Sequence, residues 1–169
     1  AQQLPSPGQD KPLSTDRVVS GIAKGGTDNS WVYPSPQMFY NSLVRKGKGE
    51  QVKAEDVNAM VAIHNNMNEQ TWKQVMEWER LHADDAGAAA DGNGKEPKLL
   101  KFIGRPDDLS PKARLRMWLG HRAPFDRHDW TVDRGGKLVR YVIDYYHDES
   151  GVVKDATPSH MHDAHAMKS

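Results

Sequence analysis

The sequence predicts an α+β domain in which several helices pack on a small antiparallel β-sheet, with long irregular segments between the elements. Apolar residues recur at helical spacing in the first half of the chain, and two runs near residue 140 alternate polar and apolar residues around a turn. Residues 1–30 are rich in Pro and Gly and hold few large apolar side chains. We therefore expect an extended or disordered arm there.

Ser-Pro pairs mark the predicted starts of two helices. Ser35 and Ser110 each stand directly before a proline, which suits an N-cap followed by the first helical residue. A glycine follows each segment, at the position where helices commonly stop. These signals predict helices over 36–46 and 111–119.

Helical spacing also marks the segment between them. Apolar positions at i, i+3, i+4 and i+7 include Val57, Met60, Val61 and His64. This pattern predicts a helix over 54–66, and Asn68 is placed to cap a second helix over 69–82. The small and polar residues of 84–97 predict a flexible loop.

The strongest strand signal lies near the end of the chain. The strings HDWTVD and KLVRYVIDYY alternate on either side of RGG, which predicts a β-hairpin over 128–146, and KLLKFIGR (98–105) is a candidate strand. The predicted organisation is an arm over 1–30, a domain over 31–147 and a polar tail over 148–169.

Composition excludes several classes of function. The chain has 169 residues, 37% of them hydrophobic, with 23 basic and 23 acidic side chains and a mean hydropathy of −0.80. The lack of cysteine excludes disulfides, thiolate metal sites and a cysteine nucleophile. A general nucleic-acid binder has a basic excess over the whole domain, so we expect no nucleic-acid partner. Charge is nevertheless segregated, because residues 110–140 carry eight basic and three acidic side chains.

His64 is the first candidate for chemistry, because it extends an apolar helical stripe. A histidine there is commonly a core residue that bonds a neighbour, and without other information that interpretation is favoured. The alternative is an iron ligand, since neutral imidazole is the usual protein ligand of haem. Aromatic side chains that suit a haem face are near in sequence: Trp31, Tyr33, Phe39, Tyr40 and Trp72.

A second cluster consists of Arg127, His128, Arg134 and Arg140. Arginine binds carboxylates through a two-pronged contact, and haem carries two propionates. The competing interpretation, which spacing alone favours, is that these residues pair with the aspartates of the hairpin, namely Asp126, Asp129, Asp133 and Asp144.

Four strings in one collinear order resemble the holocytochrome c-type synthases, also called cytochrome c haem lyases. The strings are WVYPSPQMFYN (31–41), MVAIHNNMNEQTW (60–72), SPKARLRMWLGHRAPFDRHDW (110–130) and VDRGGKLVRYVIDYY (132–146). The resemblance runs from about Leu13 to Lys168. Some family features are absent here, such as Cys-Pro motifs, and family members continue past this C-terminus, so we expect the family domain to extend beyond it.

The resemblance implies an enzyme that attaches haem b to apocytochrome c. Family members join the haem vinyl groups to the thiols of a Cys-Xaa-Xaa-Cys-His segment, and they also engage the N-terminal helix of the apocytochrome. The implied location is the mitochondrial intermembrane space, with peripheral binding to the inner membrane. The substrate supplies both thiols, so an enzyme without cysteine is consistent with this chemistry.

The resemblance also carries site residues over to matching positions. His64, in the IHN string, matches the axial ligand of the haem iron, and Trp31 belongs to the same haem-binding region. Glu69 and Arg134 match functionally important positions. The resulting candidates are catalytic His64, Glu69 and His128, and haem-binding Trp31, Tyr33, His64, Asn65, Arg127, Arg134 and Arg140.

Two other functions stay open at this stage. One is a haem carrier that delivers haem to apocytochrome c without forming bonds. The other is an interaction module in which the basic segment 110–122 binds a partner such as anionic lipid.

Overall fold

The computed structural model describes residues 3–82 and 96–147 of the chain. The chain divides into two compact units, which we call the first unit (residues 1–21 and 30–69) and the second unit (22–29 and 70–169). In this described part of the chain, three α-helices and two small sheets confirm the predicted α+β class. The boundaries predicted at residues 31 and 147 stay predictions.

The first unit contains most of the segment that was predicted to be an extended or disordered arm, and its described residues form an ordered, largely extended chain. Strand β1 (Val19–Ala23) pairs with β2 (Ser30–Val32). Residues before β1 are held by the fully buried side chain of Gln37, whose Oε1 accepts bonds from Gln9 Nε2 and the Leu13 backbone N–H at 3.0 Å each. Side-chain and backbone hydrogen bonds thus order a segment whose apolar content is low.

Helix α1 (Pro36–Arg45) begins as predicted. The Ser35 hydroxyl accepts a bond from the Met38 backbone N–H at 3.2 Å, which satisfies one of the unpaired donors of the first turn. The helix ends at Arg45, one residue before the expected end, and Gly47 then adopts a positive φ of 69°.

Helix α2 runs without a break from Val57 to Leu81, so the prediction of two helices separated at Asn68 was wrong. A 3₁₀ turn, Ala54–Asp56, precedes it. An asparagine within a helix is only mildly unfavourable, and burial further along outweighs that preference. Val57 and Val75, one in each unit, are both completely buried.

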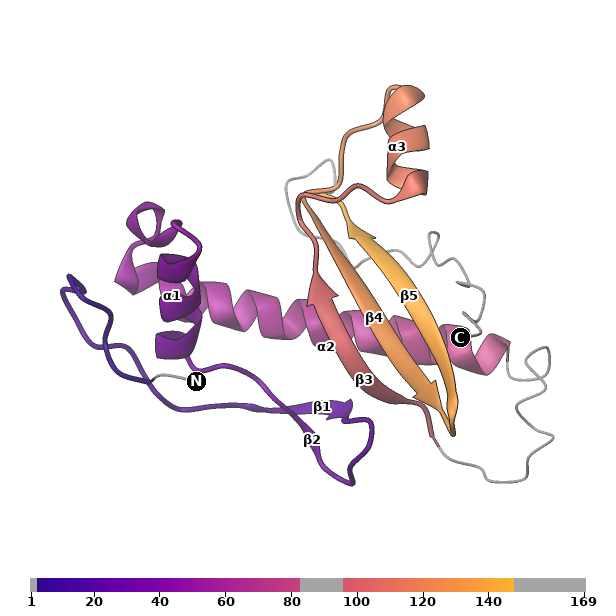
Figure 1. Cartoon of the computed structure of the whole chain (residues 1–169), viewed down its shortest axis with the longest axis horizontal. Helices are drawn as coiled ribbons and strands as arrows, with labels where there is room; N and C mark the ends of the chain where they lie inside the picture. The colour runs from indigo at the N-terminus through magenta and orange to yellow at the C-terminus, as the bar shows by residue number, and fades with distance from the viewer. Residues whose placement is uncertain (1–2, 83–95, 148–169) are drawn as a thin grey trace. The chain divides into compact units, whose positions relative to one another are not determined.

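The second unit is built on a three-stranded antiparallel sheet (Figure 1). The strands are β3 (Lys98–Gly104), β4 (Asp126–Arg134) and β5 (Lys137–Tyr145), in that order across the sheet. The predicted hairpin is observed, two residues longer at its start and one shorter at its end. Gly135 and Gly136 have positive φ angles of 64° and 110° at the tight turn, which suits glycine.

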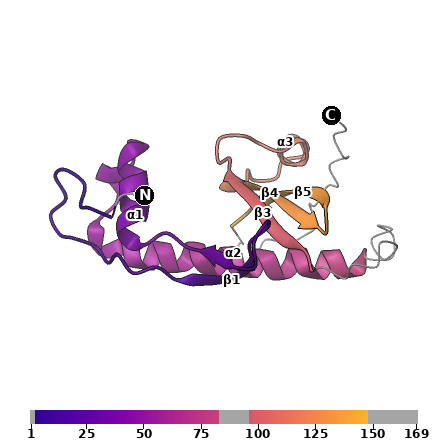
Figure 2. The same ribbon diagram turned by 60° about the horizontal axis from the view of Figure 1, so that its bottom comes forward.

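The C-terminal half of α2 lies against one face of this sheet (Figure 2). The rings of Trp72 and Trp130 are 6.4 Å apart, and the hydroxyls of Thr71 and Tyr145 are 3.0 Å apart. Trp130, Tyr145 and the neighbouring Val132 are at most 2% exposed. The core of the second unit therefore lies between α2 and the sheet.

Helix α3 (Pro111–Trp118) lies between β3 and β4 in the chain and again starts after a capping serine. The Ser110 hydroxyl accepts a bond from the Ala113 backbone N–H at 3.0 Å. Most of the predicted loop over 84–97 and the predicted tail over 148–169 lie outside the described residues. None of the helices in residues 3–82 and 96–147 meets the length and hydropathy that crossing a bilayer requires.

Candidate functional site

His64 lies on α2 in the first unit, and its imidazole is half-buried. Its ring centroid is 5.4 Å from that of Phe39 on α1, with the planes tilted by 50°. The neighbouring Ile63 is 53% exposed, so this part of α2 is open to solvent. The imidazole therefore combines an aromatic neighbour with partial access, which is what a haem ligand on a protein surface needs.

One carboxylate organises the residues around this turn of α2. Glu69 Oε1 accepts hydrogen bonds from the Ser20 hydroxyl at 2.5 Å, from the Tyr33 hydroxyl at 2.9 Å and from the Gly21 backbone N–H at 3.1 Å. We call Ser20, Gly21, Tyr33 and Glu69 the Glu69 cluster. A Cβ atom at Gly21 would lie 3.0 Å from Glu69 Oε2, so a larger residue there would require the Glu69 carboxylate to shift.

Tyr33 links this cluster to the turn that carries His64. Its hydroxyl also lies 3.4 Å from the backbone oxygen of Asn65. Burial raises the pKa of the Tyr33 phenol above its usual range, and Glu69 raises it further, while the bond with Ser20 acts in the opposite direction. The phenol consequently keeps its proton and remains a donor.

The structure brings together several of the predicted residues in the first unit. His64 and Asn65 are consecutive on α2, and Tyr33 and Glu69 fix the backbone next to them. Trp31 lies in β2, two residues before Tyr33, and is half-buried. The side chains predicted around His64 thus lie mainly on α2 and on the segment formed by β2 and the residue that follows it.

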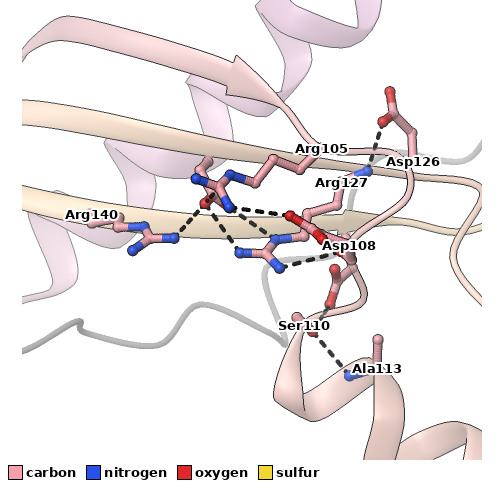
Figure 3. Close-up of polar contacts among 9 residues, drawn as sticks. Arg105, Asp108, Ser110, Ala113, Asp126, Arg127 and Arg140 are labelled. Carbon is pink, nitrogen blue, oxygen red and sulfur yellow. Dashed lines mark hydrogen bonds and ion pairs between the residues drawn. The ribbon is translucent and has the colours of Figure 1, made fainter.

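A second cluster lies at the sheet of the second unit, where the side chains of Arg105, Arg127 and Arg140 come together (Figure 3). The carboxylate of Asp129 is 6% exposed and receives both prongs of Arg127, at 2.9 and 3.1 Å. Arg105 Nε approaches the same carboxylate at 3.3 Å, and Arg140 also donates to it. We call Arg105, Arg127, Asp129 and Arg140 the Asp129 cluster. Arg105 also pairs with the carboxylate of Asp108 at 3.2 Å, so three guanidinium groups face two carboxylates and one positive charge remains in excess.

Arg127 and Arg140 thus pair with Asp129 of the hairpin, which is the interpretation that sequence spacing alone favoured. The Arg127 side chain is buried and donates also to the backbone oxygen of Asp108 at 3.2 Å, whereas the Arg140 side chain is 47% exposed. The two arginines predicted to bind propionates therefore differ in their access to a ligand.

Arg134 has a different partner from those that its sequence position suggests. Its guanidinium forms an ion pair with Glu79 of α2 and donates to the Tyr141 hydroxyl at 3.1 Å, and Tyr141 itself donates to Glu79. Burial by itself would lower the pKa of Arg134, but the bonds to Glu79 and Tyr141 raise it on balance. Burial also raises the pKa of Tyr141, and Glu79 adds to that increase. We call these three residues the Glu79 cluster.

His128 lies on β4 and is buried, with both ring nitrogens near polar groups. Nε2 is 3.1 Å from Asp126 Oδ2, and Nδ1 is 3.4 Å from the Tyr145 hydroxyl. In the neutral ring with the proton on Nε2, Asp126 accepts from His128 and Tyr145 donates to Nδ1. The Thr71 hydroxyl then donates to Tyr145, which gives a chain of hydrogen bonds with one consistent direction.

Sequence reasoning missed Ser20, Glu79, Tyr141 and Arg105, which complete these clusters. Glu79 and Tyr141 are 62 positions apart in the chain, so no local spacing joins them. The one available signal was charge, because a glutamate next to the apolar face of α2 needs a partner when it is buried.

Metal-binding chemistry other than haem ligation is not indicated by the described residues. Within residues 3–82 and 96–147, the structure contains no group of three or more His, Cys, Asp or Glu side chains that would enclose a metal ion. A porphyrin already supplies four ligands to its iron, so a single imidazole such as His64 is the donor that haem chemistry calls for.

The fold and the clusters define a small α+β protein that presents one half-buried imidazole on a long helix. Comparison with known proteins gives its family. The family model "Cytochrome c/c1 heme lyase" matches residues 1–163, and the chain belongs to that family.

Curated relatives agree with this assignment. The chain is 50% identical to the holocytochrome c-type synthase of Gallus gallus over 147 residues, which are 85% of this chain and 51% of the relative. It is 44% identical to the Homo sapiens holocytochrome c-type synthase over 90% of this chain and 55% of the relative. It is 44% identical to the Saccharomyces cerevisiae holocytochrome-c synthase over 86% of this chain and 61% of the relative.

The chain therefore spans about half the length of the Gallus gallus and Homo sapiens relatives. No solved structure matches it significantly. The resemblance that the sequence strings indicated is confirmed at the level of the family.

Proposed function

We propose that this chain attaches haem b covalently to apocytochrome c, as a lyase that forms carbon–sulfur bonds. Membership of the heme lyase family over residues 1–163 is the observation that carries the proposal. The half-buried imidazole of His64 on α2 supports the proposal, because it can serve as an iron ligand. His64 lies within the family-like string MVAIHNNMNEQTW (60–72).

The reaction adds a substrate thiol across a haem vinyl group. A carbon–sulfur bond and a carbon–hydrogen bond form, while the S–H bond and the π bond of the vinyl group are lost, so no external oxidant or reductant takes part in the addition. The reactive carbon belongs to the haem and the sulfur to the peptide. The contribution of the protein is to hold the vinyl carbon and the thiol sulfur in attack geometry. Such positioning can lower the activation barrier by as much as about 7–11 kcal/mol.

His64 is the proposed axial ligand of the haem iron. An imidazole nitrogen on one face of the porphyrin leaves the opposite face for the histidine of the Cys-Xaa-Xaa-Cys-His segment. The contact with Phe39 limits the orientations of the ring. Trp31, Tyr33 and Asn65 are proposed haem-binding neighbours from the same unit, with Trp31 as the aromatic contact.

Glu69 is proposed to act on His64 as a positioning residue. Its carboxylate fixes the Tyr33 hydroxyl, which in turn contacts the backbone oxygen of Asn65, directly after His64. Loss of the carboxylate would release the strand end and the helix turn from one another, and the imidazole would lose its fixed orientation.

In the second unit, the proposed role of each charged side chain depends on whether a ligand in solvent can reach it. Arg140 is the proposed propionate ligand, because it is half-exposed and belongs to the positively charged Asp129 cluster. Arg127 and Arg134 support the same function by fixing β4 through Asp129 and Glu79. His128 is the proposed proton-transfer group, since Asp126 and Tyr145 give its two nitrogens defined roles.

The proposed partners are haem and apocytochrome c, the latter bound through its N-terminal helix and its Cys-Xaa-Xaa-Cys-His segment. The proposed location is the mitochondrial intermembrane space, at the surface of the inner membrane. Kinship with eukaryotic holocytochrome c synthases supports this location.

Co-expression with apocytochrome c tests the proposal. The wild-type chain should yield cytochrome c whose haem survives denaturing electrophoresis, and His64→Ala should reduce that yield at least about tenfold, because even the loss of a group that orients a metal ligand costs about 10–100-fold. His82→Ala is the matched control, because His82 directly follows α2 and its Nδ1 lies 2.9 Å from the Trp78 backbone oxygen in the preceding turn. Its product yield should equal that of wild type.

The same experiment separates the lyase from the haem carrier. A carrier would bind haem through His64 and still give no thioether-linked product in a host that lacks other cytochrome c maturation proteins. Equal product from wild type and His64→Ala would remove the iron-ligand role.

A further inference from the structure

Helix α3 contacts the sheet of the second unit through one of its sides. The Ser110 hydroxyl at its N-terminus donates to Asp144 of β5 at 2.5 Å, and Ala113 is completely buried. The Arg116 guanidinium lies 5.3 Å from the centre of the Tyr146 ring, a favourable cation–π distance. This side fixes the orientation of the helix.

The opposite side of α3 presents large apolar residues to solvent. Leu115, Trp118 and Leu119 are spaced at i, i+3 and i+4, which places them on one face of the helix and its end. Their exposed fractions are 55%, 81% and 63%. Met117 and Phe125 are also exposed, at 40% and 37%. Such a concentration of exposed apolar side chains on a short segment indicates a binding surface.

The charge around this apolar face has a single sign. Residues 110–125 contain four basic side chains, Lys112, Arg114, Arg116 and Arg122, and none that is acidic. Arg114 and Arg122 are exposed. The chain as a whole is neutral, so this positive charge is a local feature and not a general property of the protein surface.

We propose that residues 111–122, which we call the α3 segment, dock on an anionic phospholipid surface. Leu115 and Leu119 would enter the boundary between headgroups and acyl chains, Trp118 would lie at headgroup level, and Arg114 and Arg122 would contact lipid phosphates. Interfacial helices combine these features, an apolar face with an aromatic residue and flanking cations. The inference deepens the peripheral membrane association proposed above, and it does not depend on haem attachment.

Vesicle sedimentation of the full chain tests the inference directly. The protein should sediment with vesicles that contain phosphatidylcholine and phosphatidylglycerol, and only weakly with vesicles of phosphatidylcholine alone. Raising the salt concentration should release it, because screening weakens the attraction between the arginines and the lipid phosphates. Soluble glycerol phosphate should not displace it, since a free headgroup offers no apolar layer.

Substitutions distinguish the roles of the two kinds of side chain. Trp118→Ala should weaken vesicle binding roughly tenfold, and Arg114→Glu should weaken binding to anionic vesicles by a similar factor. Trp118→Phe should keep most of the binding and lose the shift in tryptophan fluorescence that accompanies it. Leu138→Ala and Lys137→Glu are matched controls on β5, where Leu138 is 53% exposed, and both should bind as wild type does.

Three results would overturn the proposal. The first is equal binding to neutral and anionic vesicles, and the second is unchanged binding by Trp118→Ala and Arg114→Glu. The third is concentration-dependent self-association that Trp118→Ala abolishes while vesicle binding is absent, because a second copy would then cover this face. None of these measurements uses haem. A negative result on vesicle binding would therefore not contradict the proposed lyase function, and absence of lyase activity would not contradict the proposed docking.

Discussion

Glu69 and Glu79 lie ten residues apart on the same helix, and each accepts a hydrogen bond from a tyrosine, but their surroundings differ in charge. The donors to Glu69 in the first unit are uncharged: Ser20, Tyr33 and the Gly21 backbone N–H. Glu79 in the second unit accepts a hydrogen bond from the Tyr141 hydroxyl and forms an ion pair with the guanidinium of Arg134. The first cluster therefore retains one negative charge, and the second is neutral.

The difference indicates which carboxylate serves mainly the fold. Glu79 is 7% exposed, and its ion pair with Arg134 fastens α2 to the hairpin of the second unit. Glu69 is only half-buried and holds the backbone beside His64. Removal of Glu79 leaves an uncompensated buried cation, whereas removal of Glu69 leaves only neutral donors, some of which can turn to water.

The largest effect is expected for Glu79→Gln. The amide oxygen can still accept from Tyr141, but Arg134 loses its counter-charge in a buried site, so the free energy of unfolding should fall by about 3–5 kcal/mol. Denaturant unfolding followed by circular dichroism measures this change. The double variant Glu79→Gln with Arg134→Met should recover more than half of the loss.

The control for this variant is Glu77→Gln, an exposed glutamate two positions earlier on α2. It should change the free energy of unfolding by no more than about 0.5 kcal/mol. If the double variant were less stable than Glu79→Gln alone, the ion pair would not be the reason for the loss, and the comparison of the two clusters would fail.

A smaller loss of stability is expected for Glu69→Gln. Three bonds to a charged acceptor become bonds to a neutral one, which should cost about 1–2 kcal/mol. The variant should also bind haem more weakly, because the turn that carries His64 is less well fixed. Isothermal unfolding and a haem titration measure the two effects.

Glu55→Gln is the matched control in the same unit, since Glu55 is exposed in the 3₁₀ turn before α2. It should leave both measurements unchanged. A cost for Glu69→Gln as large as that for Glu79→Gln would contradict the assigned difference between an uncharged and a charged set of donors.

The smallest expected effect concerns Tyr33 and Tyr141 and the free energy of unfolding at alkaline pH. The pKa values of Tyr33 and Tyr141 are raised in the folded protein, chiefly by burial and then by their glutamates. An unfolded tyrosine loses its proton near pH of about 10, while the folded one keeps it, so stability is full below that pH and falls as pH rises further. The slope should reach at most about 1.4 kcal/mol per pH unit for each tyrosine.

Tyr33→Phe and Tyr141→Phe should each make the free energy of unfolding less dependent on pH above a pH of about 10. Unfolding curves at a series of alkaline pH values provide the test. A pH dependence that neither substitution alters would mean that other groups govern alkaline unfolding.

Local signals predicted those parts of the fold that local physics decides. Ser35 and Ser110 cap α1 and α3 through their own hydroxyl groups, and Gly135 and Gly136 form the hairpin turn with positive φ angles. Asn68 gave a false signal, because a capping residue within a helix is overruled when contacts on both sides continue the helix.

The candidate site could be proposed from the sequence only where the family-like strings or the helical period mark it. His64 stands out because it extends an apolar stripe and matches the family motif. The partners of Glu79 and Asp129 follow from the pairing of β4 and β5 and from the packing of α2 against the sheet. The contacts of Glu79 join residues that are far apart in the sequence, so spacing along the chain contains no information on them, whereas Arg127 lies only two positions from Asp129 and that pairing was favoured by spacing.

Haem titration followed by absorption spectroscopy tests most directly whether His64 holds the iron. The wild-type chain and His82→Ala should give the same Soret band, typical of imidazole ligation, and His64→Ala should lose that band and regain it on addition of free imidazole. A Soret band in His64→Ala that is identical to that of wild type without added imidazole would contradict the account.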